Sequence, residues 1–244
     1  MVKVAVVGLD KAELERELTR RGFVLEKFKP DIVVSIGGDG CALIAEHLYP
    51  GVPRLTIKNS EHCKKCEVSD GHDLGKVLDK LERKQYRIVD EMKVEGSVES
   101  VGSKDRAERL TGLNEINVSH ALPICAIRFD VSIDGKPVET GVIGDGAVVA
   151  TPYGSTGYFR VITGRKFSKG LGVALNNSNK DVKYRFANEN SEVRIKLNRG
   201  PAVMCADNNT TMVQLSEGDT VVVRRAKGNA KLIVLEGEES KVVL

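Results

Sequence analysis

The segment Asp31-Ile32-Val33-Val34-Ser35-Ile36-Gly37-Gly38-Asp39-Gly40 joins an apolar run directly to a glycine-rich tetrapeptide. An uninterrupted apolar run is typical of a parallel strand that is buried on both faces. Similar runs lie at residues 2–8 and 54–57, and leucines at helical spacing follow them at residues 11–21 and 73–84. Strands that alternate with helices predict βαβ units and a parallel sheet over about the first ninety residues.

The pattern changes beyond about residue 88, where short alternating runs are separated by turn signals. The runs lie at residues 127–133, 147–150, 192–197, 212–215, 220–223 and 232–235. Asp134-Gly135 and Lys227-Gly228-Asn229 are two of the predicted turns. We therefore expect an α/β nucleotide-binding domain over residues 1–88 and an antiparallel, strand-rich domain over 89–244. This division leaves open whether the last strand or tail returns to the first domain.

Composition excludes several classes of partner. Lys and Arg total 37 and Asp and Glu total 34, so the net charge is only +3. Nucleic-acid binders usually carry a larger basic excess, and a chain with no Trp and 5% aromatic residues is poorly equipped for base stacking. No window approaches the ~18 apolar residues of a membrane span, and the start of the chain is typical of a strand rather than a signal peptide. We expect a cytoplasmic protein that binds neither nucleic acid nor membranes.

Five cysteines, at positions 41, 63, 66, 125 and 205, form an odd and scattered set. Such a set does not predict a disulfide framework and fits a reducing compartment. The Cys63-x-x-Cys66 pair, with His62 and His72 nearby, leaves three alternatives open: a structural zinc site, a redox disulfide, or a loop without a special role. The last is favoured because no second Cys-x-x-Cys pair exists. Cys125 and Cys205 lie in apolar runs and are predicted to be core residues.

The Gly37-Gly38-Asp39-Gly40 motif follows a buried strand, at the sheet edge where open α/β proteins bind ligands. Glycines let the backbone approach phosphates closely, but the pattern fits neither a Walker loop nor a Rossmann loop. The carboxylate of Asp39 would repel phosphate unless it faced a metal ion or a hydroxyl group, such as one awaiting phosphorylation. A tight turn in which Asp39 caps a helix explains the tetrapeptide equally well.

Two further segments carry candidate binding residues. In Leu113-Asn114-Glu115-Ile116-Asn117, Glu can accept two hydrogen bonds from a ribose diol and Asn can pair with a base edge. Taken alone, this segment is more typical of a polar turn before a strand. In Gly144–Tyr158, a short apolar strand runs into a loop dense in glycines and hydroxyl groups. That density favours a binding function over a simple turn.

In this order, the three motifs resemble those of the NAD kinase family in its archaeal-sized form. The resemblance extends over about residues 31–160, and the third motif is its most specific part. It implies an α/β domain followed by a β-sandwich domain, with the active site between them. It also implies transfer of the γ-phosphoryl group of ATP, or of polyphosphate, to the 2′-hydroxyl of the adenosine ribose of NAD. A divalent cation such as Mg²⁺ would accompany ATP, and the family forms homodimers or homotetramers.

The resemblance assigns roles to individual residues of this chain. Asp39 would orient or deprotonate the hydroxyl group, and Gly37, Gly38 and Gly40 would make room for phosphates. Asn114 and Glu115 would hold the adenine and ribose groups of the dinucleotide, and Asn59 is the residue retained from the family's loop after the third strand. The nucleoside pockets would be lined by Asp145, Thr151, Ser155, Thr156 and Tyr158.

Several positions depart from the family pattern. Cys41 replaces the usual Thr, residues 60–66 lack the usual glycines and apolar plug, and the Ser-Ala-Gly-Gly-Pro stretch after Tyr158 is missing. These changes affect the phosphate side more than dinucleotide binding. Two alternatives therefore stay open: a non-catalytic member that binds NAD(P), and a related kinase that acts on another hydroxyl acceptor.

Overall fold

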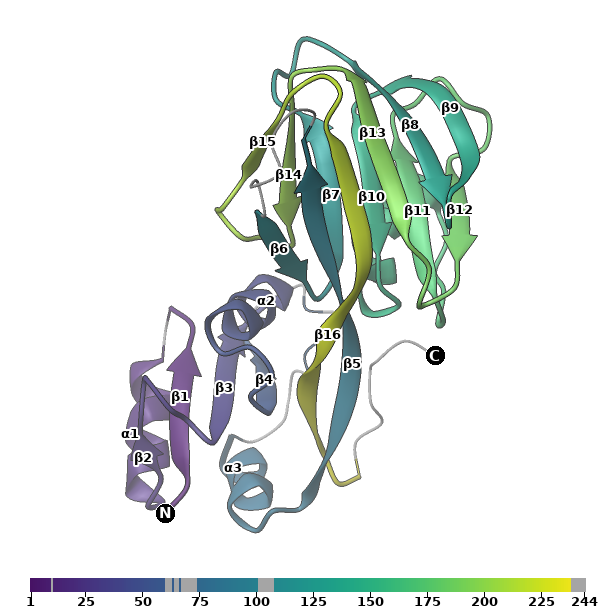
Figure 1. Cartoon of the computed structure of the whole chain (residues 1–244). Coiled ribbons are helices and arrows are strands. Elements are labelled where there is room, and N and C mark those ends of the chain that lie inside the picture. The colour runs from purple at the N-terminus through teal and green to yellow at the C-terminus, as the bar shows by residue number, and fades with distance from the viewer. Residues whose placement is uncertain (10, 60–62, 64–65, 67–73, 101–107, 238–244) are drawn as a thin grey trace. The chain divides into compact units, whose positions relative to one another are not determined.

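The computed structural model describes residues 1–9, 11–59, 63, 66, 74–100 and 108–237 (Figure 1). The chain divides into two compact units. We call Met1–Glu91, together with the chain from Asn229 onward, the α/β unit, and Met92–Gly228 the strand-rich unit. Two long strands, β5 (Tyr86–Glu99) and β16 (Thr220–Leu235), contribute residues to both units.

The α/β unit is built on a parallel sheet with the strand order β2-β1-β3-β4-β16 (Figure 1). Its remaining strands are β1 (Lys3–Val7), β2 (Val24–Leu25), β3 (Ile32–Gly37) and β4 (Arg54–Lys58). The helices are α1 (Ala12–Arg20), α2 (Asp39–Leu48) and α3 (Leu74–Glu82). The predicted parallel sheet is confirmed.

Helices cover this sheet on both faces, which explains why β1 and β3 are largely apolar. Leu14 and Leu18 of α1, with Leu78 of α3, join the cluster that contains Val4 and Val34. On the other face, Ala45 of α2 belongs to a cluster with Ala5, Val7 and Val33. These three strand residues are next in sequence to strand residues that pack with the first cluster. Successive side chains of a strand point to opposite faces, so β1 and β3 fill two apolar layers.

The strand-rich unit contains a six-stranded antiparallel sheet in the order β12-β11-β10-β7-β14-β15. These strands are β7 (Glu115–His120), β10 (Gly146–Ala150), β11 (Leu171–Asn176), β12 (Tyr184–Ala187), β14 (Ala202–Ala206) and β15 (Val213–Leu215). A 3₁₀ helix, η1 (Tyr153–Thr156), and helix α4 (Tyr158–Thr163) follow β10. Phe159 of α4 packs with Val148 and Ala174, so α4 covers β10 and β11.

A second layer of strands completes a sandwich within this unit. β16 pairs with β13 (Val193–Arg199), β13 with β8 (Ile127–Ile133), β8 with β9 (Lys136–Gly144), and β5 with β6 (Arg109–Gly112). One core cluster takes side chains from both layers, including Ile116 and Val149 from the first and Phe129 and Ile195 from the second. The predicted fold class, an α/β domain with a parallel sheet plus an all-β sandwich, is confirmed.

Three details of the sequence prediction are wrong. The turn at Lys227-Gly228-Asn229 does not form, because β16 continues through it and pairs with β13 before it and with β4 at Leu232. The segment after Thr151 folds into η1 and α4 rather than a loop, because Phe159 finds an apolar surface to cover. Cys125 is exposed rather than in the core, since it lies in the connection between β7 and β8.

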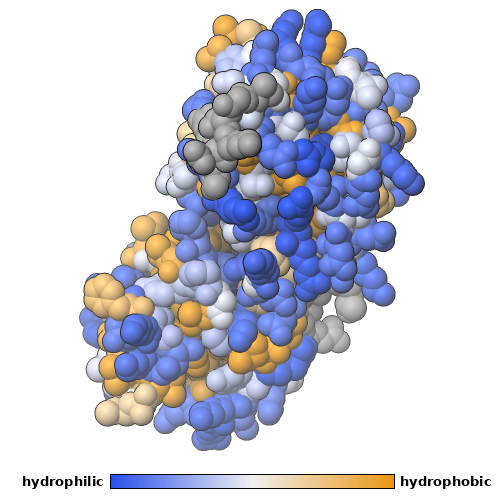
Figure 2. Space-filling view, in the orientation of Figure 1, coloured by the Kyte–Doolittle hydropathy of each residue, from blue (hydrophilic) through white to orange (hydrophobic). Residues whose placement is uncertain are grey.

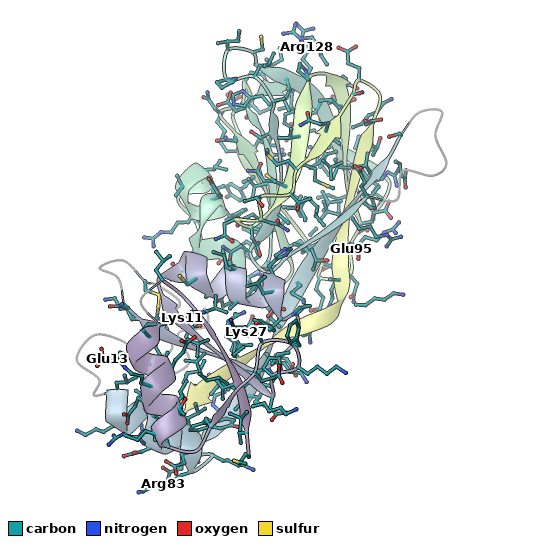
Figure 3. All side chains as sticks on the ribbon, turned by 90° about the vertical axis from the view of Figure 1, so that its left-hand side faces the viewer. Lys11, Glu13, Lys27, Arg83, Glu95 and Arg128 are labelled. Atoms are coloured by element: carbon teal, nitrogen blue, oxygen red, sulfur yellow. A yellow bond between two sulfur atoms is a disulfide. The ribbon has the colours of Figure 1, made fainter. Side chains whose placement is uncertain are left out.

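Hydrophilic residues predominate on the visible face of the strand-rich unit (Figure 2). Surface ion pairs of this unit include Arg109 with Glu95, and Glu95 is labelled in Figure 3. Among the described residues, none of the helices has the length and apolarity needed to cross a membrane.

The pairing of β10 with β7 leads to a prediction about stability. Gly146 has a φ of +144°, and a Cβ at this position would overlap the carbonyl oxygen of Val118. Gly146→Ala is therefore expected to lower the free energy of unfolding by about 3 kcal/mol or more. Gly135 is the matched control, because it also has a positive φ, of +76°, but no atom within 4 Å of the Cβ position.

Gly135→Ala is expected to cost only about 1 kcal/mol, from backbone conformation alone. Urea unfolding followed by circular dichroism measures both variants. Equal losses would show that close approach of β10 to β7 does not constrain residue 146.

Candidate functional site

In the α/β unit, the Gly-Gly-Asp-Gly motif lies at the junction of β3 and α2. Gly37 ends the strand, Gly38 is the N-cap residue in an extended conformation, and Asp39 and Gly40 already belong to the first turn of α2. The helix thus begins within the motif itself. An acidic residue in the first turn interacts favourably with the helix dipole, so the fold accommodates the charge of Asp39 where the strand ends.

Gly37 occupies a position that disfavours a side chain. Its φ is +147°, and a Cβ there would lie 2.5 Å from the Sγ atom of Cys41. The carbonyl oxygen of Gly37 accepts a hydrogen bond from the backbone N–H of Asn59 at 3.1 Å. Asn59 directly follows β4, so the ends of two neighbouring parallel strands meet here. The structure therefore brings together the five predicted site residues of this unit, Gly37, Gly38, Asp39, Gly40 and Asn59.

Two cysteines adjoin the same strand end, a feature that sequence reasoning did not connect with Asp39. Cys63 and Cys66 form a disulfide, which was the least favoured of the three alternatives (Figure 3). The Sγ atom of Cys63 lies 3.2 Å from Oδ1 of Asp39, and Sγ of Cys66 lies 3.5 Å from the carbonyl oxygen of Gly37. His62 and His72, the other candidates for a zinc site, lie outside the described residues.

In the strand-rich unit, the second and third motifs meet at one end of the six-stranded sheet. β7 and β10 are paired so that Glu115 lies opposite Ala150, which places Thr151 beside Asn114. The backbone N–H of Thr151 donates to the carbonyl oxygen of Asn114 at 2.8 Å, and its hydroxyl group donates to the carbonyl oxygen of Leu113 at 2.7 Å. The Oγ1 atom of Thr151 in turn accepts the N–H of Gly154 at 2.9 Å. Thr151 therefore ties the two motifs together.

The polar side chains of this cluster are buried. Asn114, Glu115, Thr151 and Ser155 are each at most 9% exposed. A Cβ added to Gly157 would lie 3.7 Å from a carboxylate oxygen of Glu115 and 3.8 Å from the side-chain nitrogen of Asn114, so both side chains border the same space. The hydroxyl oxygen of Ser155 has no hydrogen-bond partner among the described residues.

Asp207 positions the second motif, and sequence reasoning missed this role. One carboxylate oxygen of Asp207 accepts the backbone N–H groups of Asn114 and Glu115 at 2.8 and 3.1 Å, and the other accepts that of Leu113 at 2.7 Å. In the sequence, Asp207 stands in the pair Asp207-Asn208, which by itself predicts no contact with the second motif. Because 92–94 residues separate the partners, spacing alone does not reveal the contact.

The other three predicted residues are placed differently. Thr156 ends η1 and is half-buried, and Tyr158 begins α4 with 56% of its surface exposed. Asp145 precedes β10, whereas the cluster lies after it, so one strand of five residues, about 17–20 Å, separates them. Asp145 instead accepts a hydrogen bond from Asn177 at 3.2 Å. The structure therefore does not bring Asp145 together with Glu115.

The charge of Glu115 affects its surroundings. Burial, and then the negative charge of Glu115, raise the pKa of the Cys205 thiol. Cys205 lies on β14 and is half-buried, so the predicted core position holds only in part. Its thiol is protonated at neutral pH, and a reactive thiolate is not expected beside the cluster.

The Asp207 contacts predict a local change in backbone protection. Asp207→Ala removes the acceptor of three N–H groups, so the amides of Leu113, Asn114 and Glu115 should exchange hydrogen about tenfold faster or more. Asp134 is the matched control: it has a similar positive φ, and its carboxylate accepts the N–H of Glu192 at 2.9 Å. Asp134→Ala should accelerate exchange at Glu192 and leave residues 113–115 unchanged. Amide exchange measured by NMR compares the two variants, and equal protection of 113–115 in Asp207→Ala would contradict the assigned role.

Comparison with known proteins identifies the family. The family model described as the ATP-NAD kinase C-terminal domain matches residues 113–235. This region contains Asn114, Glu115, Thr151, Ser155 and Asp207, so the matched part is the one that carries the buried polar cluster.

Individual relatives agree with this match. The chain is 34% identical over 137 residues to NAD kinase 1 of Trichormus variabilis, a match that spans 52% of this chain but only 44% of that relative. It is 28% identical to the NAD kinase of Thermoplasma acidophilum, over 91% of this chain and 80% of the relative. The fold matches that of yeast NADH kinase complexed with NADH with a TM-score of 0.84 at 15% identity, over 97% of this chain and 84% of that one.

The family model covers half of the chain, and the segment it covers holds the cluster at which two separate motifs are joined by Thr151 and Asp207. On these grounds the chain belongs to the ATP-NAD kinase family.

Proposed function

We propose that this protein is an NAD kinase, which transfers the γ-phosphoryl group of ATP to the 2′-hydroxyl of the adenosine ribose of NAD. The observation that carries the proposal is the buried cluster of Asn114, Glu115, Thr151 and Ser155 within the segment matched by the family model. Buried polar groups are costly unless they are satisfied, and Ser155 retains an unpartnered hydroxyl oxygen among the described residues. A bound nucleoside would satisfy such a group.

In this proposal the cluster binds the dinucleotide. Glu115 accepts hydrogen bonds from a ribose diol, and Asn114 pairs with the adenine edge. Thr151 lines the nucleoside pocket, and its hydroxyl group holds the pocket in shape through its bonds to the backbone of Leu113 and Gly154. Ser155, Thr156 and Tyr158 line the nucleoside pocket, and Asp145 is retained as a binding residue on the family resemblance alone.

Asp39 supplies the chemistry. Phosphoryl transfer needs positioning of the attacking hydroxyl group and acceptance of its proton. The carboxylate of Asp39 performs both tasks, while Gly37, Gly38 and Gly40 leave the backbone accessible to phosphates and Asn59 borders them. This assignment is supported by the position of Asp39 at the end of a central parallel strand, where α/β proteins bind ligands.

Mg²⁺ is implied for ATP, and the described residues near Asp39 do not form a cage for it. The one carboxylate there is grouped with two sulfur atoms, with all three ligand atoms within 4.8 Å of one another. Mg²⁺ prefers oxygen ligands and usually retains waters and phosphate oxygens, so this donor set does not suit it. We propose that the ion arrives coordinated to the phosphates of ATP.

One observation favours a second candidate, a non-catalytic member that binds NAD(P). The Cys63–Cys66 disulfide lies against Asp39, where the family usually has glycines and an apolar plug. A single assay separates the candidates: NADP formation from NAD, ATP and Mg²⁺, with ATP binding and NAD binding measured separately. Binding without NADP formation would favour the second candidate, and phosphorylation of a different hydroxyl compound would favour a related kinase.

We further propose that the protein is a cytoplasmic homo-oligomer, a dimer or tetramer, with no nucleic-acid or membrane partner. The family resemblance supports the oligomer, and the balanced charge supports the absence of a nucleic-acid partner.

The proposed role of Asp39 predicts a loss of turnover with retained binding. Asp39→Asn preserves the shape and a hydrogen-bond acceptor but cannot take a proton at neutral pH, so kcat should fall by roughly 10²–10⁴. The Kd for NAD should stay the same or fall slightly. If Asp39 were only a helix-terminal residue, Asn would replace it with little effect. A kcat within a few-fold of the parent would exclude Asp39 as the base.

The proposed role of Glu115 predicts weaker dinucleotide binding. Glu115→Ala should weaken NAD binding by roughly 1–3 kcal/mol, the range for lost charge-assisted hydrogen bonds. Glu115→Gln retains the volume and isolates the contribution of the charge, and Glu217→Gln, at an exposed turn position, is the control. Calorimetry with NAD measures all three. Unchanged affinity in a folded Glu115→Ala protein would remove this residue from the site.

A further inference from the structure

The Cys63–Cys66 pair has a place in the α/β unit that the proposed phosphoryl transfer does not use. Cys66 is fully buried, with its sulfur 3.5 Å from the carbonyl oxygen of Gly37, whereas Cys63 is half-buried. The sulfur of Cys63 lies 3.2 Å from Oδ1 of Asp39. The more accessible sulfur is therefore also the one that contacts the carboxylate.

The oxidation state of Cys63 changes what it offers to that carboxylate. A disulfide sulfur carries no hydrogen, so in the disulfide Cys63 makes only a van der Waals contact with Oδ1 of Asp39. A thiol at the same place has an S–H group, which is a weak hydrogen-bond donor. Reduction thus gives Asp39 a neighbouring donor, within hydrogen-bonding reach for sulfur, that oxidation removes.

We propose that Cys63 and Cys66 form a reversible thiol–disulfide exchange site whose oxidation state controls how Asp39 receives its substrate hydroxyl group. In the disulfide form, Oδ1 of Asp39 has no sulfur donor beside it. In the dithiol form, the S–H group of Cys63 competes with the substrate hydroxyl for the same carboxylate. Cys63 is a positioning residue in this scheme, because it acts only through Asp39.

The exchange reaction takes a dithiol as its reductant. A thiolate of the dithiol attacks Sγ of Cys63, the S–S bond breaks, and Sγ of Cys66 leaves as a thiolate that takes up a proton. The second thiolate of the reductant then attacks the mixed disulfide, releases Cys63, and leaves the reductant as a disulfide. Two electrons pass from the dithiol to the protein, and an oxidised dithiol reverses the reaction.

The effect on turnover has a definite direction. Reduction should lower kcat about fivefold, as expected for losing about 1 kcal/mol to a competing weak hydrogen bond, and leave the KM for NAD unchanged. This part rests on the proposed phosphoryl transfer. The exchange site itself and its contact with Asp39 have readouts that do not depend on activity.

The first experiment counts thiols in the whole protein. Oxidised and reduced protein are prepared with oxidised and reduced dithiothreitol, denatured, alkylated and weighed by mass spectrometry. Cys41, Cys125 and Cys205 are free in the structure, so three labels are expected after oxidation and five after reduction. A count that does not change, or cysteines that bind stoichiometric zinc until the metal is removed, would overturn the proposal.

The second experiment measures the NMR signal of the Asp39 carboxyl group directly. In protein labelled with ¹³C at aspartate carboxyl groups, the Asp39 resonance is assigned by its absence in Asp39→Asn. It should shift on reduction of the parent and stay fixed in Cys63→Ala. If the Asp39 resonance does not shift on reduction, the proposed coupling between Cys63 and Asp39 is overturned, even if the thiols exchange. If the resonance shifts while no NADP forms in either state, the phosphoryl-transfer proposal fails and the exchange site stands.

The third experiment separates the hydrogen bond from a merely structural effect. Cys63→Ala provides no donor and should have the oxidised rate under both conditions, whereas Cys63→Ser retains a hydroxyl donor and should have the lower, reduced rate under both. Cys66→Ala leaves Cys63 as a thiol and should match Cys63→Ser. Cys125→Ala, at an exposed cysteine of the other unit, should respond to reduction like the parent.

Equal rates for Cys63→Ala and Cys63→Ser would overturn the proposed competition between Cys63 and the substrate hydroxyl group. If a variant does not fold, the test is the parent protein itself, and equal kcat values in its oxidised and reduced states would overturn the proposal.

Discussion

The pairing of β10 with β7 is the constraint on which the candidate binding cluster depends. Its register sets Ala150 opposite Glu115, so the residue after β10 and the residue before β7 are neighbours. Thr151 and Asp207 then bind the backbone of residues 113–115 through hydrogen bonds from two directions. A shift of one residue would turn every side chain of β10 to the opposite face and would separate the polar groups. The register is firm because β10 is buried on both faces, between the sandwich core and α4.

In the α/β unit, strand pairing also positions the candidate residues, but the strands are parallel. β3 and β4 end at the same edge of their sheet, so Gly37 and Asn59 meet without being close in sequence. The turn from β3 into α2 gives residue 37 a φ of +147°, which strains any side chain there, and the helix begins with Asp39. The chemistry assigned to Asp39 therefore depends on a backbone arrangement in which glycine is required for steric reasons.

The sulfur atoms beside Asp39 give this member of the family an unusual neighbourhood for a carboxylate. A disulfide is uncharged and bears no hydrogen, while two thiols add weak donors to the same small space. Among the departures from the family pattern in this segment, Cys63 contacts one carboxylate oxygen of Asp39. A Cys-x-x-Cys pair in this segment changes the chemistry around Asp39 without requiring a change in the parallel sheet.

The sequence was sufficient for features that depend on local patterns. Apolar runs and leucine spacing predicted the parallel sheet and its helices, because residues near in sequence share one element. The ordered motifs likewise predicted the family, since each motif is a continuous segment. The strands β9, β11, β12 and β14 were not predicted, and the turn predicted at 227–229 does not form, because pairing with distant strands decides whether a short segment is extended.

For the candidate site, the sequence alone determined which residues carry suitable chemistry: Asp39, Asn114, Glu115 and the hydroxyl groups after β10. Only the tertiary structure decided their neighbours. Asp207 is more than ninety residues from the amides it accepts, Asp145 lies one strand away from the cluster its motif suggested, and Cys63 contacts Asp39 across 24 positions. Hydrogen bonds and van der Waals contacts act over a few ångströms in space, whereas sequence patterns record only separation along the chain.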